Sequence, residues 1–176
     1  MKKNIFLTGP PSCGKTTVIK KILEKCPFSC KGFFTEEIRE EGRRQGFLMK
    51  SLDGKKALLG HRTIVSPFQV SKYGVSIENI EALAVPSITP DRDGQVIILD
   101  EIGKMECFSQ EFQKAAIRVL DSSHPVIGTI AVGGTEFIRK IKERDDIDII
   151  EVTRENRNHL TEKILEKVGY ALESRH

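Results

Sequence analysis

Residues 4–17 read Asn-Ile-Phe-Leu-Thr-Gly-Pro-Pro-Ser-Cys-Gly-Lys-Thr-Thr. The apolar residues 5–7 suit a short buried strand, and the stretch from Gly9 to Thr16 fits the P-loop pattern G-x-x-x-x-G-K-[ST]. Gly9 and Gly14 permit backbone angles and close approaches that a Cβ would block, so the N–H groups of the loop can turn inward around phosphate oxygens. In such a loop Lys15 reaches the β- and γ-phosphates, and the Thr16 hydroxyl is placed to bind Mg²⁺.

The surroundings of the loop separate a P-loop from the alternative, a Gly-Pro turn that happens to precede a helix. Val18, Ile19, Ile22 and Leu23 recur at helical spacing after the loop. A helix that opens near Lys15 adds its free N–H groups and the positive end of its dipole to a phosphate site. Strand, loop and helix in this order therefore predict nucleotide binding.

The composition is ordinary for a soluble globular protein, with 39% hydrophobic and 30% charged residues. With 176 residues, the chain is long enough for a real core, and we expect residues 1–176 to form one domain. There is no run of 18 apolar residues, and the apolar run behind Met-Lys-Lys-Asn is too short for a signal peptide. We therefore expect a cytoplasmic protein without a membrane partner, and also a monomer. A net charge of +3 is too small to indicate a nucleic-acid partner.

The four cysteines are Cys13, Cys26, Cys30 and Cys107. Cys26 and Cys30 are four residues apart, but no matching pair of Cys or His residues accompanies them, so a zinc site is not expected. In a reducing cytosol a disulfide is not expected either. Cys26 continues the helical spacing of the first helix and is expected to lie in the core.

Apolar runs alternate with helical patterns along most of the chain. Residues 96–99 are fully apolar, which is typical of a strand buried on both faces. Residues 126–132 suit another buried strand, and residues 147–152 suit a last strand. Alternating strands and helices predict an α/β fold with a mostly parallel central sheet that helices cover on both sides.

Residues 31–62 have a different character. Their strand-like runs, with the turn signal Asp53-Gly54 between them, predict an antiparallel β-hairpin insert. We expect a loop over residues 63–74, a short helix from Ser76, and another loop that Pro86 marks.

The run Val-Ile-Ile-Leu-Asp-Glu over residues 96–101 marks the second half of the site. Ligands of parallel α/β sheets bind beyond the carboxyl ends of the strands, so Asp100 is expected in the same crevice as the P-loop. Four apolar residues that end in Asp fit a Walker-B strand, in which Asp100 holds Mg²⁺ directly or through water. The alternative is an Asp that merely ends a strand.

Glu101 adds a possible base. A carboxylate next to the metal Asp can orient or deprotonate a water molecule that attacks the γ-phosphate, which favours hydrolysis over transfer to an acceptor. Lys104 can stabilise charge on the transferred phosphoryl group, and Glu106 can orient Lys104 or the water. Taken alone, each of these two also fits a solvated loop charge, and Thr129 fits either a phosphate contact or the core.

Four motifs together resemble the thermophile-type nucleoside-triphosphatase family. They are Gly-Pro-Pro-Ser-Cys-Gly-Lys-Thr at 9–16, Gly-Phe-Phe-Thr-Glu-Glu-Ile-Arg at 32–39, Asp-Glu-Ile-Gly-Lys-Met-Glu at 100–106, and Asn156-Arg157. The resemblance covers nearly the whole chain and implies a three-layer, RecA-like P-loop NTPase fold with an added antiparallel element. It implies slow, Mg²⁺-dependent hydrolysis of ATP, GTP and other nucleoside triphosphates to the diphosphate and phosphate. Cys13 and Asn158 depart modestly from the family pattern.

The resemblance also places Asn156 and Arg157 near the base, whereas the local sequence suggests a helix cap with Thr153 at the N-cap. We expect catalytic roles for Lys15, Glu101, Lys104 and Glu106, and Mg²⁺ ligation by Thr16 and Asp100. The expected nucleotide-binding residues are Gly9, Pro10, Pro11, Ser12, Cys13, Gly14, Lys15, Thr16, Thr17, Ile97, Ile98, Leu99, Asp100, Glu101, Ile102, Gly103, Lys104, Asn156 and Arg157.

Other functions stay open at this point. Arg39, Arg43, Arg44 and Arg62 are candidates for an arginine finger from the insert, with a solvated hairpin as the alternative. The main alternative function is a nucleotide or nucleoside kinase, whose insert would hold a phosphate acceptor. A third is a nucleotide-dependent binding module, for example for RNA, against which the small net charge argues.

Overall fold

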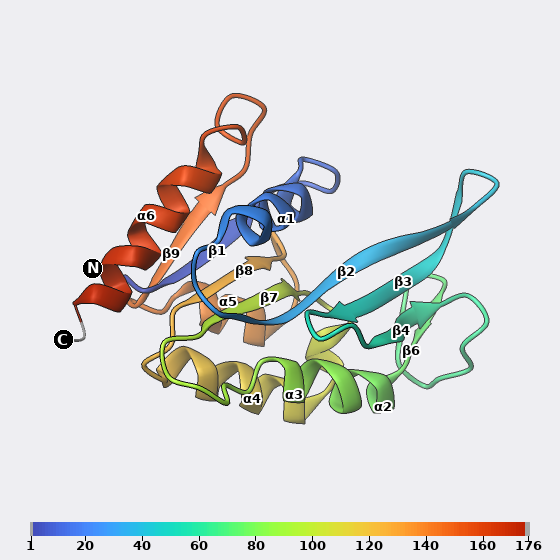
Figure 1. The fold of residues 1–176 in the computed structure, drawn as a ribbon. Coiled ribbons are helices and arrows are strands. Elements are labelled where there is room, and N and C mark those ends of the chain that lie inside the picture. The colour runs from blue at the N-terminus through green and yellow to red at the C-terminus, as the bar shows by residue number, and fades with distance from the viewer. Residues whose placement is uncertain (1, 175–176) are drawn as a thin grey trace.

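A computed structural model describes residues 2–174 (Figure 1). The elements in chain order are β1 (Asn4–Thr8), α1 (Lys15–Lys25), β2 (Cys30–Glu40), β3 (Arg43–Ser51), β4 (Lys56–His61), β5 (Gln69–Val70), β6 (Tyr73–Val75), α2 (Ile77–Asn79), a π-helical turn (Ile80–Ala84), α3 (Val85–Ser87), β7 (Val96–Ile102), a 3₁₀ turn (Glu106–Phe108), α4 (Gln110–Asp121), β8 (Val126–Ile130), α5 (Glu136–Lys142), β9 (Ile147–Glu151) and α6 (Leu160–Glu173).

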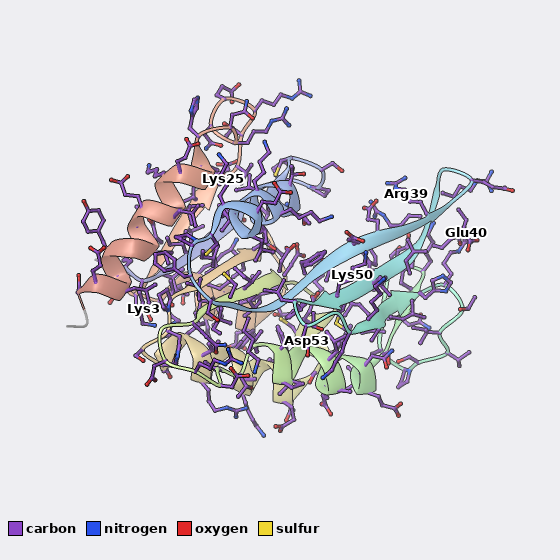
Figure 2. All side chains as sticks on the ribbon, in the orientation of Figure 1. Lys3, Lys25, Arg39, Glu40, Lys50 and Asp53 are labelled. Atoms are coloured by element: carbon purple, nitrogen blue, oxygen red, sulfur yellow. The ribbon has the colours of Figure 1, made fainter. Side chains whose placement is uncertain are left out.

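Within the described residues the strands form one open, nine-stranded sheet in the order β5-β6-β4-β3-β2-β7-β8-β1-β9. Four neighbouring strands pair in parallel, in the order β7, β8, β1, β9. The first residues of β2, up to Phe33, also pair in parallel with β7. From Phe33 onward, β2 pairs antiparallel with β3, and Figure 2 shows Arg39 and Glu40 at the outer end of this hairpin. The predicted fold class is confirmed, and the antiparallel pairing continues past residue 62 to Val75.

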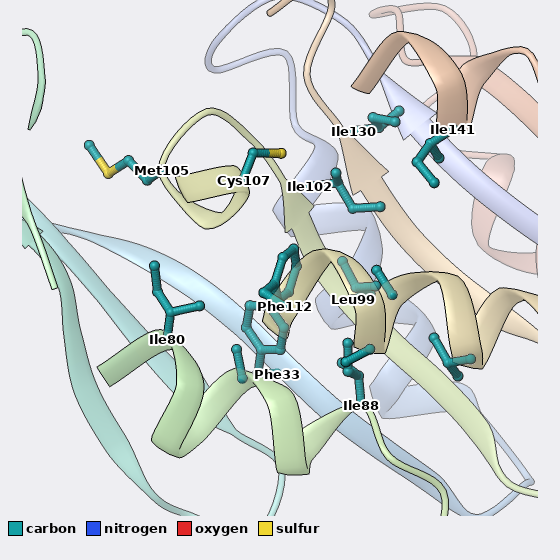
Figure 3. Close-up of a cluster of buried hydrophobic side chains, with 14 of the residues drawn as sticks. Phe33, Ile80, Ile88, Leu99, Ile102, Met105, Cys107, Phe112, Ile130 and Ile141 are labelled. Carbon is teal, nitrogen blue, oxygen red and sulfur yellow. The ribbon is translucent and has the colours of Figure 1, made fainter. Parts of the chain in front are cut away.

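Helices cover both faces of the parallel part of the sheet. In Figure 1, α1 and α6 lie on one face, and α2, α3 and α4 lie on the other. Successive residues of β1 point to opposite faces, so Ile5 and Leu7 pack with α1 and α6 while Phe6 packs with the α4 side. On the α4 side, the rings of Phe33 and Phe112 meet edge to face at 6.3 Å (Figure 3).

Two local expectations are wrong. Residues 63–74 are not all loop, because β5 and most of β6 lie there and pair with one another. The loop expected at Pro86 does not form there either, because α2, the π-helical turn and α3 continue without interruption from Ile77 to Ser87. In the wider π-turn the Val85 N–H bonds the Ile80 carbonyl, and Pro86, which lacks an N–H, follows directly in the first turn of α3.

None of the helices within residues 2–174 is long and apolar enough to cross a membrane.

Candidate active site

The P-loop connects β1 to α1 and has the backbone shape that its two glycines allow. Gly9 and Gly14 have φ angles of 142° and 108°, which residues with a Cβ rarely adopt. A Cβ on Gly9 would also lie 2.9 Å from the Cys13 sulfur and 3.2 Å from the Val152 carbonyl oxygen, so the loop has no room for one. Gly14 directly precedes α1, whose first N–H groups have no partner within the helix. Loop and helix start together form a cradle for an anion.

Lys15 folds back over this cradle. Its ammonium donates hydrogen bonds to the carbonyl oxygens of Gly9, at 2.8 Å, and Pro10, at 3.0 Å, and it lies 3.8 Å from the Cys13 sulfur. An ionised phosphate oxygen is a stronger partner for an ammonium than a neutral carbonyl oxygen. The two carbonyls therefore hold the Lys15 charge at the mouth of the loop in a way that an incoming phosphate can displace.

Behind the loop, three oxygen-bearing side chains are connected by hydrogen bonds. The Thr16 hydroxyl, in the first turn of α1, donates to Asp100 Oδ2 at 3.1 Å, and the Thr129 hydroxyl on β8 donates to Asp100 Oδ1 at 2.5 Å. Burial raises the pKa of the Asp100 carboxyl, and the two hydroxyl donors oppose that rise. Hydroxyl and carboxylate oxygens are the hard donors that Mg²⁺ prefers, so Thr16 and Asp100 fit the expected metal. Thr129 itself positions Asp100.

Two further carboxyl groups converge beyond Asp100. Glu101 follows Asp100 through a cis peptide bond, and the buried Glu106 accepts a hydrogen bond from the Gly103 N–H at 3.1 Å. A Cβ on Gly103 would lie 2.6 Å from Glu101 Oε1 and 2.9 Å from Glu106 Oε2. Both carboxyl groups therefore lie against Gly103, where a larger residue would not fit.

This crowding changes how the two carboxyl groups titrate. Burial, followed by the charge of Asp100, raises the pKa of Glu101. Burial, followed by the charge of Glu101, raises the pKa of Glu106 to about 8. A carboxylate whose pKa is raised is a better proton acceptor near neutral pH than an ordinary one.

We expect Glu106→Gln to change how stability depends on pH. The pKa of Glu106 is about 8 in the folded protein, against about 4.3 in an unfolded chain. The contribution of this carboxyl group to stability is therefore fully present below about pH 4.3, where it is neutral in both states. That contribution is lost as the pH rises through 8. Gln keeps an oxygen for the Gly103 N–H and never ionises. The free energy of unfolding of the variant therefore rises relative to wild type by up to about 5 kcal/mol between acidic and alkaline pH.

Urea unfolding over that pH range measures the effect. The matched control is Glu111→Gln, which changes an exposed carboxylate that pairs with Lys114 at the start of α4. The Lys114 contact lowers the pKa of Glu111, so this control should run parallel to wild type at neutral and alkaline pH, where the Glu106 effect is expected. Parallel pH curves for Glu106→Gln and wild type would show that Glu106 titrates normally.

A cavity of about 760 Å³ opens in front of the P-loop. Lys15, Thr16 and Glu101 all line it, and so do residues of the β2–β3 hairpin and of the loop after β8. Lys104 lies outside this cavity and lines a neighbouring one of about 280 Å³, together with Glu101 and Glu106. Glu101 thus faces both spaces, and the two cavities meet at its side chain.

The hairpin brings one of its arginines, Arg44, to the large cavity. Arg44 forms an ion pair with Glu37, and its guanidinium carbon lies 5.4 Å from the centre of the Phe47 ring. Its buried Nε has no hydrogen-bond partner within residues 2–174. Arg39 pairs with the same Glu37 at 2.7 Å, but from the outer end of the hairpin (Figure 2).

The apolar residues of β7 lie away from the cavity. The side chains of Ile97, Ile98, Leu99 and Ile102 are 0% exposed and belong to the two core clusters on either face of the sheet. Figure 3 shows Leu99 and Ile102 among the buried side chains. These residues hold the end of the strand in place, and their side chains do not offer a nucleotide contact.

Asn156 has a structural task of its own. Its side chain accepts a hydrogen bond from the Thr153 N–H at 2.9 Å and donates one to the Glu151 carbonyl at 2.7 Å. The Thr153 hydroxyl accepts a hydrogen bond from the Asn156 N–H at 3.3 Å, as a cap would, but this stabilises a turn. Because α6 begins at Leu160, the prediction that Thr153 caps the last helix is wrong.

Arg157 lies against the P-loop. Its Cδ is 3.6 Å from the position that a Cβ on Gly14 would take, and its Nη1 is 3.9 Å from it. Arg157 also lines a small cavity of about 260 Å³ with Gly14, Thr17 and Lys21. Glu101 does not line this third cavity, which shares Gly14 and Thr17 with the large one.

A phosphate-binding loop between the first strand and helix, set at the carboxyl end of a parallel sheet, defines the P-loop NTPase class of proteins. A family model described as NTPase matches residues 4–165. Since this match spans most of the sequence, the chain belongs to the NTPase family.

Individual relatives agree with this assignment. "Nucleoside-triphosphatase THEP1" of Thermotoga sp. (strain RQ2) is 41% identical over 162 residues, which cover 92% of this chain and 92% of the relative. "Cancer-related nucleoside-triphosphatase" of Homo sapiens is 38% identical over 182 residues, with coverage of 94% and 96%. The crystal structure of THEP1 from Aquifex aeolicus matches with a TM-score of 0.85 at 35% identity, over 94% of this chain and 98% of that one. The family that the sequence motifs predicted is confirmed.

Proposed function

We propose that this member of the NTPase family hydrolyses the β–γ phosphoanhydride bond of Mg²⁺-bound nucleoside triphosphates, ATP and GTP among them. The observation that carries the proposal is the convergence of Lys15, Thr16 and Glu101 on one cavity, with Asp100 hydrogen-bonded to Thr16 directly behind the P-loop. The relatives from Thermotoga and Homo sapiens are named nucleoside-triphosphatases, and this similarity supports the same reaction for the present chain.

The chain's own groups suit each part of this reaction. The P-loop N–H groups and the Lys15 ammonium bind the β- and γ-phosphates. Glu101 orients a water molecule and accepts its proton as the water oxygen attacks the γ-phosphorus. The bond from that phosphorus to the β–γ bridging oxygen breaks, and the diphosphate and inorganic phosphate leave. The positive charge of Lys15 offsets the negative charge that gathers on the bridging oxygen.

Thr16 and Asp100 would hold the Mg²⁺ ion, which neutralises charge on the phosphate oxygens when it is bound. EDTA is therefore expected to abolish phosphate release, and added Mg²⁺ to restore it.

The base is proposed to lie on the Arg157 side of the loop. The cavity of about 260 Å³ that Arg157 lines with Gly14, Thr17 and Lys21 begins directly beside the phosphate cradle. A guanidinium plane can stack on any base, which is consistent with broad use of nucleoside triphosphates. In this assignment Asn156 acts indirectly, since its amide stabilises the turn that carries Arg157.

We also propose that Arg44 contributes positive charge to the transferred phosphoryl group. It lines the cavity, Glu37 and Phe47 restrain it, and its Nε has an unused N–H in the described structure. An arginine in this role can raise kcat by orders of magnitude. We expect Arg44→Ala to lower kcat by at least about tenfold with little change in nucleotide affinity.

Steady-state phosphate release and binding of a nonhydrolysable triphosphate analogue measure this effect. Arg39→Ala is the matched control, because it removes the other arginine that pairs with Glu37. Equal kcat values for the two variants would rule out a specific role for Arg44.

The test of the function itself is phosphate release from Mg²⁺-ATP and Mg²⁺-GTP by the purified chain, alone and with a panel of nucleoside monophosphates and nucleosides. Release without an acceptor is the expected result. If no phosphate were released without an acceptor, and diphosphate formed when one compound of the panel was added, the protein would instead be a kinase. Nucleotide-dependent, salt-sensitive RNA binding without turnover would establish a binding module.

We also propose how the chain is organised and where it works. Residues 1–176 act as a single domain, because both core clusters draw on strands and helices from the two ends of the chain. The enzyme acts in the cytoplasm, where its four free cysteines are stable. The P-loop, Glu101 and Arg44 line one cavity without a residue from a second copy, so a monomer is sufficient for the proposed reaction.

A further inference from the structure

Two thiols meet where α1 passes into β2. Cys26 directly follows α1, and Cys30 is the first residue of β2. Their sulfur atoms are 3.2 Å apart, within reach of a thiol–thiol hydrogen bond. Both side chains are only half-buried, so the expectation that Cys26 lies in the core is wrong.

The segment between the two cysteines holds this arrangement in place. Phe28 packs against the core cluster on the α1 and α6 face of the sheet. The Ser29 carbonyl accepts a hydrogen bond from the Val96 N–H at 2.9 Å, and Cys30 pairs with Val96 in the parallel ladder. The short distance between the sulfurs thus follows from an anchored backbone.

The two thiols are also chemically unequal. The Cys30 S–H group is the main cause that lowers the pKa of Cys26, to about 6, while the same contact and burial raise the pKa of Cys30. Cys30 also lies 3.6 Å from the Phe28 carbonyl oxygen, which is an alternative acceptor for the same S–H proton. Cys26 therefore has the character of an attacking thiolate, and Cys30 that of a thiol that acts second.

We propose that Cys26 and Cys30 form a dithiol site that exchanges with low-molecular-weight disulfides of the glutathione type. The site lies outside the nucleotide-binding residues, and the proposal does not depend on the proposed function. It agrees with the expectation from sequence that no disulfide forms in a reducing compartment: the pair stays reduced there and closes reversibly only when an oxidised disulfide is supplied.

The exchange takes two steps. The Cys26 thiolate attacks one sulfur of glutathione disulfide, the bond between the two glutathione sulfurs breaks, and one glutathione leaves as a thiolate that takes up a proton. The Cys30 thiol then gives up its proton, attacks the Cys26 sulfur and expels the second glutathione, which is protonated in turn. Two protein thiols are oxidised to one disulfide, and one glutathione disulfide is reduced to two thiols.

The experiment exposes the whole chain to glutathione disulfide, blocks the remaining thiols with iodoacetamide, and maps the products by mass spectrometry. Wild type is expected to show a Cys26–Cys30 link and little mixed disulfide. Cys30→Ser is expected to accumulate the Cys26–glutathione mixed disulfide at least about tenfold above wild type, because the second thiol that resolves it is missing. Cys107→Ser, which removes a buried thiol elsewhere, should behave as wild type does.

A second probe works without an oxidant. Phenylarsine oxide bridges two neighbouring thiols, so it should bind wild type and Cys107→Ser, and should bind neither Cys26→Ser nor Cys30→Ser. Circular dichroism confirms that the variants are folded. Equal amounts of mixed disulfide in wild type and Cys30→Ser, or arsenical binding that survives both single substitutions, would overturn the proposal.

Discussion

The Glu101→Gln variant is expected to bind Mg²⁺-ATP as wild type does and to hydrolyse it about 10²–10⁴ times more slowly. Gln has nearly the same shape as Glu and still accepts a hydrogen bond, but it cannot take a proton from water. Glu101 is the carboxylate that lines both cavities, and burial beside Asp100 raises its pKa toward that of an effective base. Single-turnover phosphate release, with analogue binding measured in parallel, separates the chemical step from affinity.

The control for this variant is again Glu111→Gln, on the exposed surface of α4. If Glu101→Gln hydrolysed ATP at the wild-type rate, the base would have to lie elsewhere, and Glu106 would become the next candidate because it adjoins Glu101 at Gly103.

Lys15→Ala is expected to lose most of both binding and turnover, with kcat/KM lower by about 10²–10³. The substitution removes the ammonium that the Gly9 and Pro10 carbonyls hold at the mouth of the loop. Without it, the P-loop N–H groups alone must balance the charge of the β- and γ-phosphates. Analogue binding and phosphate release measure the loss.

Lys25→Ala is the matched control for Lys15→Ala. Lys25 lies in the last turn of the same helix and pairs with Glu162 on the protein surface, so its loss changes net charge equally and leaves the loop intact. Wild-type activity in Lys15→Ala would mean that residues 9–16 do not bind the phosphates of the substrate.

The parts of the fold that the sequence predicted correctly are those that local patterns determine. The P-loop depends on two glycines with positive φ and on an apolar strand and helix around them, all within residues 4–25. The strand that carries Asp100, β7, depends on the unbroken apolar run of residues 96–99, which fits a doubly covered strand. In both cases the residues that decide the structure are neighbours in the chain.

The parts that were missed depend on contacts between distant residues. Nothing near Pro86 signals a π-turn, because the packing of the helix against the sheet selects it. Thr129 reads equally well as a core residue until β7 and β8 are paired and its hydroxyl meets Asp100. Likewise, the sequence alone presents four arginines as equal candidates for an arginine finger. Only the pairing of β2 with β3 brings one of them, Arg44, to the cavity.

The position of β1 within the sheet has a consequence for how the chain is made. β1 is synthesised well before both of its neighbours in the sheet, β8 (Val126–Ile130) and β9 (Ile147–Glu151). Until β8 and β9 have left the ribosome, the strand that precedes the P-loop has no partner, and its apolar centre, residues 5–7, is of the kind that associates with other chains. The strand that leads into the phosphate-binding cradle is therefore fully paired only after β9 has been made, although its own sequence is translated before that of either neighbour.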